Sequence, residues 1–157
     1  MNFTTAFLLP LLIGIIAGLR SMIAPAAVSW AARLGWLTLA PTSLAFLGAA
    51  ITPWILTALA LGELVADKLP STPSRTVPVG FGTRILSGGL SGAAIGAAGG
   101  SLLTGLLSGA IGAVIGTLGG RAARGHLAAA LGRDRPAALI EDAVAIGGAF
   151  LIIAALR

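Results

Sequence analysis

Residues 85–120 read ILSGGLSGAAIGAAGGSLLTGLLSGAIGAVIGTLGG, a stretch that contains no charged side chain. A membrane-spanning helix needs about 20 apolar residues, so this stretch is long enough for two passes or for a re-entrant hairpin. Gly99 and Gly100 interrupt it near the centre, and we therefore expect two short helices over 83–99 and 101–120. Glycines recur every four residues along both, which places small residues on one face and lets two backbones touch. The spacing predicts close helix packing, with a glycine-lined pore or lipid groove as the alternative.

The composition of the whole chain is also strongly apolar. Of its 157 residues 57% are hydrophobic and 10% are charged, and the mean hydropathy is +1.01. These values are typical of an all-α, polytopic membrane protein and not of a soluble domain. The chain contains no cysteine, which excludes disulfides and thiol catalysis. The net charge of +5 is concentrated in two short loops, a pattern that favours topology signals and contacts with anionic lipids over binding of nucleic acid.

Three further apolar runs predict about five spans in a single transmembrane domain over 1–157. The first run, 3–32, would form a helix of about 45 Å, longer than the hydrocarbon core of a bilayer. Because Pro25 lies inside this run, we expect a kinked or broken helix there. The run lacks the positively charged start of a signal peptide, so we expect it to be retained. The other two runs are 43–66, which is followed by a proline-containing loop, and 137–156.

Basic residues predict the orientation in the membrane. With five crossings, the loops 67–84 and 121–136 lie on the same side, and the positive-inside rule places that side in the cytoplasm. The N-terminus is then cytoplasmic and the C-terminus lies outside. We expect the single histidine, His126, to be a solvated residue of the second loop. The basic residues of the two loops are Lys68, Arg75, Arg84, Arg121, Arg124, Arg133 and Arg135.

Four carboxylates lie at the cytoplasmic ends of two expected spans. Glu63 and Asp67 are spaced i,i+4 and so share one helix face, while Glu141 and Asp142 lie in the first two turns of the last span. Charge at membrane depth is costly, and such groups are therefore candidates for a functional site. The dipole of a helix favours anions at its N-terminus and disfavours them at its C-terminus. Glu63 and Asp67 are accordingly the stronger candidates.

Three interpretations of this cluster remain open. The carboxylates could bind a hard cation such as Mg²⁺, Ca²⁺, Mn²⁺ or an alkali ion, which prefer oxygen ligands. They could instead exchange protons, because crowded carboxylates at low dielectric hold protons more readily. They could also form a neutralised structural network with arginines. We expect Arg20, Lys68, Arg75 and Arg84 to act as counter-ions or to bind phosphate, with Arg20 either snorkelling to the outer interface or buried against a carboxylate or carbonyl.

Several segments together resemble a family of small bacterial integral membrane proteins that is catalogued as a domain of unknown function. The resemblance covers nearly the whole chain, and the Glu-x-x-x-Asp-Lys-x-Pro segment is its most specific part. It implies a bacterial inner-membrane protein and implies no activity. The segments are Gly18-Leu19-Arg20-Ser21, the run from Glu63 through Asp67-Lys68 to Pro70, Pro73-Ser74-Arg75, and Glu141-Asp142.

The features together predict a small membrane transporter or channel-like protein whose four carboxylates bind a cation or exchange protons. Because five short spans make a thin wall around a pathway, we expect a homo-oligomer packed on the glycine faces. The first alternative is a membrane enzyme or binding protein for a phosphorylated lipid, with a carboxylate-held divalent metal and with Arg75 and Arg84 on the phosphate. The second is a structural or accessory subunit. An enzyme is the less favoured class, and no catalytic residue is predicted.

Overall fold

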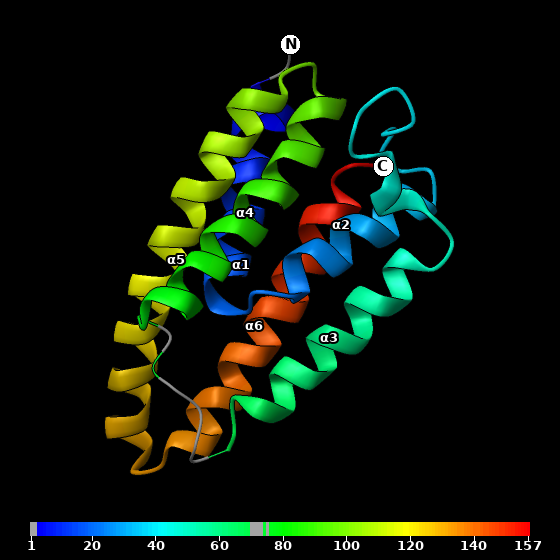
Figure 1. The fold of residues 1–157 in the computed structure, drawn as a ribbon. Helices are drawn as coiled ribbons and strands as arrows, with labels where there is room; N and C mark the ends of the chain where they lie inside the picture. Colours follow the sequence, from blue (N-terminus) through cyan, green and yellow to red (C-terminus); the bar gives the residue numbers. More distant parts are fainter. Residues whose placement is uncertain (1–2, 70–73, 75) are drawn as a thin grey trace.

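The structure, a computed structural model, describes residues 3–69, 74 and 76–157. The expected all-helical class is confirmed, since the fold is 79% helix and the described residues contain no strand. Within these described ranges six α-helices form the bundle, together with one π-helical turn, η1, and one 3-10 turn, η2 (Figure 1). The elements are η1 (Thr4–Leu8), α1 (Leu9–Leu19), α2 (Ile23–Arg33), η2 (Ala45–Gly48), α3 (Thr52–Ala66), α4 (Pro78–Ala98), α5 (Leu102–Leu131) and α6 (Asp134–Ala154).

The first apolar run is broken at Arg20, five residues before the proline that was expected to kink it. Arg20 has φ −140° and ψ 111°, an extended conformation that ends α1. Pro25 lies in the first turn of the next helix, α2, where its missing N–H costs no hydrogen bond. The proline therefore helps to begin a new helix instead of bending an existing one.

The two helices on either side of this break run in opposite directions. On α1, Gly14 lies against Gly109 and Gly18 lies against Gly116, so α1 runs parallel to α5. After the break α2 returns toward the start of α5, because Trp36, just beyond its end, lines a cavity with Gly99. Of the kinked and broken forms expected for the run 3–32, the broken one is correct, and its two parts are antiparallel helices (Figure 1).

Glycines bring α1, α4 and α5 into backbone contact. A Cβ atom added at Gly92 of α4 would lie 2.3 Å from the carbonyl oxygen of Gly105 on α5, far inside van der Waals distance. On another face of α5, a Cβ atom at Gly112 would lie 2.1 Å from the carbonyl oxygen of Leu11 on α1. Both glycine faces of α5 are therefore covered within one chain. A homo-oligomer, which remains a prediction, would have to use a different surface.

Helix α5 is longer than expected. It continues past Gly120 to Leu131 and ends at Gly132, which has φ 67° in the left-handed region where glycine is favoured. The charged residues after Gly120 end the apolar run but not the helix, because they are interspersed with alanine and leucine, which are strong helix formers. The predicted loop over 121–136 is thus mostly helix, and His126 is an exposed residue of α5.

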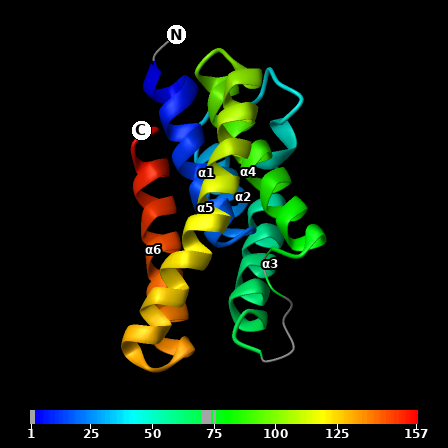
Figure 2. The ribbon, with the colours of Figure 1, turned by 90° about the vertical axis from the view of Figure 1, so that its left-hand side faces the viewer.

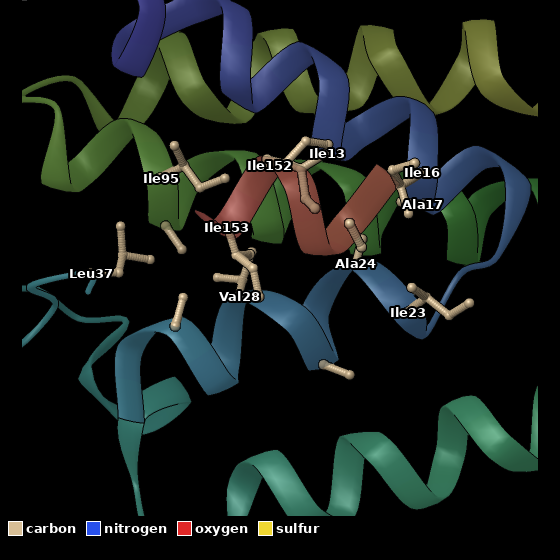
Figure 3. Packing of buried hydrophobic residues seen from close by; sticks show 14 of the residues in the cluster. Ile13, Ile16, Ala17, Ile23, Ala24, Val28, Leu37, Ile95, Ile152 and Ile153 are labelled. Carbon is tan, nitrogen blue, oxygen red and sulfur yellow. The ribbon is translucent and has the colours of Figure 1, made fainter. Parts of the chain in front are cut away.

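Helix α3 lies at the edge of the bundle and packs mainly against α2 (Figure 1 and Figure 2). It begins at Thr52, whereas the sequence predicted a helix from residue 43, and only Pro53 and Ala60 are buried along it. The buried core lies on the other helices, where α1, α2, α4 and α6 meet (Figure 3). Most of α3 therefore faces away from the protein.

The outer surface of the bundle is strongly apolar. Among the described residues thirty large hydrophobic side chains are exposed, many of them on α3, α5 and α6, which is far more than the surface of a soluble monomer normally carries. By length and composition α5 and α6 could each cross a membrane, and α3 and the region of α1 are shorter apolar helices. These observations support membrane association but leave five spans as a prediction.

Candidate functional site

Arg20 lies at the centre of a cluster of charged side chains, and its own side chain is 0% exposed. Its Nε donates a hydrogen bond of 2.7 Å to Oδ1 of Asp142. Its Nη2 lies 2.9 Å from Oδ2 of Asp67 and 3.5 Å from Oε2 of Glu141. One guanidinium therefore joins the end of α3 to the first half of α6. Of the two positions expected for Arg20, the buried one is correct.

Two further cations, Arg124 and Lys68, pair with the same carboxylates. Arg124 of α5 contacts Asp67 and Glu141 through Nη1, and it binds both carboxylate oxygens of Asp134 at 2.9 and 2.7 Å. Lys68 Nζ lies 2.6 Å from Oδ2 of Asp142. Asp67, Glu141 and Asp142 are thus each shared between two cations.

Glu63 and Arg84 occupy the break between α1 and α2. Glu63 accepts hydrogen bonds from the backbone N–H and the hydroxyl of Ser21, at 2.8 and 2.9 Å, and from the backbone N–H of Met22 at 2.8 Å. Arg84 Nη1 donates to the carbonyls of Gly18 and Leu19 at 2.9 and 2.8 Å. An anion therefore lies at the N-terminus of α2 and a cation at the C-terminus of α1, which is the favourable arrangement for both helix dipoles.

Seven of the eight predicted site residues come together in this cluster. The eighth, Arg75, lies outside the described residues. Two members, Arg124 and Asp134, were not predicted. For Arg124 a signal exists in the sequence, because it continues the four-residue spacing of Gly112, Gly116 and Gly120 and so shares their inward face. The seven are Arg20, Glu63, Asp67, Lys68, Arg84, Glu141 and Asp142.

The charges within the cluster nearly balance. All five carboxylates of the chain belong to it, and each lies within 4 Å of a described lysine or arginine nitrogen. Four described cations face them. Buried charge is tolerated only when it is paired, and this pairing explains how so many charges lie next to apolar helices.

The carboxylates, as arranged, do not fit a resident divalent cation. Among the described residues no group of three or more carboxylate or histidine side chains is placed to hold a metal ion. Ca²⁺ takes six to eight oxygen ligands and Mg²⁺ requires octahedral geometry. Here the guanidinium groups of Arg20 and Arg124 lie between Asp67 and Glu141, where a metal would have to be.

A cleft of about 340 Å³, whose exposed lining is mostly apolar, opens next to the cluster. It lies between the start of α2, the end of α3 and the start of α4. Ser21, Glu63, Asp67, Thr83 and Arg84 contribute polar groups to its lining, and the remaining lining includes apolar residues such as alanine and valine. A small ligand in this cleft would therefore reach two of the carboxylates and one guanidinium directly.

Comparison of the chain with protein-family models, curated proteins and solved structures finds no significant match. The family suggested by the Glu-x-x-x-Asp-Lys-x-Pro segment therefore remains a prediction. Any function must be inferred from the charged cluster, the cleft and the apolar surface.

Proposed function

We propose that the protein is a small polytopic membrane transporter in which the carboxylates of the charged cluster take up and release protons, or a monovalent cation, through the adjoining cleft. The observation that carries this proposal is the position of Glu63 and Asp67. Both belong to the buried ion-pair cluster, and both line the cleft. A carboxylate that is paired on one side and accessible on the other can gain or lose a proton while its partners rearrange.

The apolar helices support a location in the membrane with the cluster near one surface of the bilayer. From Leu102 to Arg124 helix α5 rises by about 33 Å, close to the 30 Å thickness of a hydrocarbon core. The apolar parts of α4 and α6 extend from the level of the cluster toward the same end of the bundle. The basic residues Arg121, Arg133 and Arg135 lie at or beyond the cluster, so the positive-inside rule assigns this end to the cytoplasm.

In this orientation both chain termini lie outside the cytoplasm. Because α1 runs parallel to α5 and α6 returns antiparallel to it, the beginning of α1 and the end of α6 share one end of the bundle (Figure 2). This proposal departs from the cytoplasmic N-terminus expected from five crossings, because the antiparallel pair of α1 and α2 adds one change of direction.

The absence of cysteine from the sequence makes this orientation directly testable. We expect single cysteines in Phe3→Cys and Arg157→Cys to react with a membrane-impermeant maleimide in intact cells. Arg133→Cys, beside the turn between α5 and α6, should react only after the cells are permeabilised. If Phe3→Cys and Arg133→Cys both react in intact cells, or if both react only after permeabilisation, this arrangement of the helices is excluded.

Exchange of protons fits the cluster better than binding of a divalent metal. A proton needs only one oxygen atom, whereas a hard divalent cation needs a full shell of ligands. Protonation of Asp67 would weaken its attraction to Arg20 and Arg124, leaving Arg20 paired with Glu141 and Asp142 and Arg124 paired with Glu141 and Asp134. The loss of these ion pairs would detach the end of α3 from Arg20 and from Arg124 of α5, while Lys68 and Asp142 would still join it to α6.

A flux assay in proteoliposomes tests this mechanism. We expect a pH gradient to dissipate faster through the wild-type protein than through empty vesicles, and we expect Asp67→Asn to reduce the rate at least tenfold. Asp134→Asn is the matched control, because Asp134 has the same charge and the same Arg124 partner but is 63% exposed and does not line the cleft. Equal rates in wild-type and empty vesicles, or unchanged flux in a folded Asp67→Asn variant, would contradict the proposal.

A structural role is the second candidate, and the contacts of Glu63 favour it. Its three hydrogen bonds fix the start of α2, which is a function that needs no ligand. If this role is the only one, Glu63→Gln lowers the unfolding temperature while the flux through wild-type protein equals that of empty vesicles.

A further inference from the structure

An apolar groove of about 280 Å³ lies between α3 and α6, with α2 behind it. Thr57 is the only hydroxyl residue of its lining, and that hydroxyl is already used. It accepts a hydrogen bond of 3.0 Å from Trp30 Nε1 and donates one of 2.7 Å to the carbonyl of Pro53. The groove therefore offers contacts for a hydrocarbon chain, and its one hydroxyl does not need a hydrogen bond from water.

The groove ends at an ion pair that bridges its two walls. Its cytoplasmic end is formed by Leu64 on α3 and Ile146 on α6. Lys68 follows Leu64 by four positions and Asp142 precedes Ile146 by four, so each lies one turn beyond the groove. Lys68 Nζ and Asp142 Oδ2 are 2.6 Å apart. A molecule lying along the groove would therefore place its end beside Lys68.

Positive charge is in excess at this end. Arg135 precedes Asp142 by seven positions and so lies on the same face of α6, two turns away. It is exposed and forms no hydrogen bond or ion pair with any part of the chain that the structure describes. Lys68 is 30% exposed, and its carboxylate partner Asp142 is shared with Arg20. An anionic group is favoured between Lys68 and Arg135.

We propose that this groove binds an anionic phospholipid, with one acyl chain between α3 and α6 and the phosphate between Lys68 and Arg135. The inference rests on the membrane location proposed above. The charge distribution selects a lipid over a second copy of the chain, because a second copy placed in the groove would bring its own basic end or its uncharged end to these cations. Since Lys68 also pairs with Asp142, the bound phosphate would contact the charged cluster through a single side chain.

Trp30 lies in the groove and can report on what fills it. The chain has three tryptophans, and a Trp36→Phe/Trp54→Phe variant leaves Trp30 as the only fluorophore. We would reconstitute it in vesicles of phosphatidylglycerol and phosphatidylcholine in which either lipid, at equal fraction, carries brominated acyl chains that quench tryptophan. We expect brominated phosphatidylglycerol to quench Trp30 at least twice as strongly as brominated phosphatidylcholine.

Two substitutions locate the site. Arg135→Gln should abolish the preference for phosphatidylglycerol without affecting folding, since this side chain has no described partner. Ala27→Phe, which fills the groove from α2, should reduce quenching by both lipids, whereas Ala143→Phe on the exposed face of α6 should not. Equal quenching by the two head groups, or an unchanged preference in Arg135→Gln, would overturn the proposal. Shielding of Trp30 from both lipids in a dimeric protein would overturn it in favour of a second copy.

A variant that retains only Trp54 separates failure of the lipid site from failure of the membrane location. Trp54 is 62% exposed on α3 and does not line the groove. If Trp54 is quenched while Trp30 shows no preference, the protein is in the membrane and only the lipid site is wrong. If neither tryptophan is quenched, the membrane location is wrong as well.

Discussion

Arg20→Gln is expected to destabilise the folded protein by about 3–5 kcal/mol, the cost typical of removing one partner from a buried ion pair. The side chain is fully buried and lies within 3.5 Å of Asp67, Glu141 and Asp142. Its loss leaves Arg124 and Lys68 to neutralise all three carboxylates. In a chain of this size the unfolding temperature should fall by about 10 °C, measured by circular dichroism in detergent micelles.

Two comparisons isolate the role of this guanidinium. Arg33→Gln removes the same charge at the other end of α2, where Arg33 is exposed, and should change stability by no more than about 0.5 kcal/mol. Adding Glu141→Gln to Arg20→Gln removes one of the uncompensated carboxylates and should restore part of the lost stability. If Arg20→Gln unfolds at the same temperature as Arg33→Gln, Arg20 does not hold the cluster together.

The part of the fold that the sequence predicts well depends on local spacing. The four-residue recurrence of Gly88, Gly92 and Gly96 correctly predicted a face for close packing, since their backbones touch α5. Glu63 and Asp67 share a helix face because they are spaced i,i+4, and both belong to the cluster. Such features require no knowledge of distant parts of the chain.

The errors concern features that distant residues decide. The change of direction at Arg20 is fixed by Glu63 and Arg84, which are 42 and 65 positions from the backbone groups that they bind. The apolar run ends at Gly120 but the helix does not, so the apolar pattern alone does not place Arg124 in the cluster. In α5 the helix continues for eleven residues beyond Gly120, and its inward face changes from glycine to arginine.

Gly109→Ala should destabilise the protein by about 3 kcal/mol, the upper part of the range for overpacking a well-packed core. A Cβ atom at this position would lie 2.2 Å from the carbonyl oxygen of Gly88, so α4 and α5 would have to move apart. The opposing atom belongs to a helix backbone and cannot turn away as a flexible side chain could. Thermal unfolding in detergent measures the loss.

Gly119→Ala on the same helix should instead raise the stability of the protein. Nothing lies within 4 Å of a Cβ atom at Gly119, so alanine adds helix propensity worth about 1 kcal/mol without a steric cost. Because both substitutions make the same chemical change in α5, their difference measures the close approach of the helices alone. The two variants should also differ in function, because moving α5 outward in Gly109→Ala withdraws Arg124 from Asp67. A Gly109→Ala variant at least as stable as Gly119→Ala would mean that α4 and α5 are not in backbone contact.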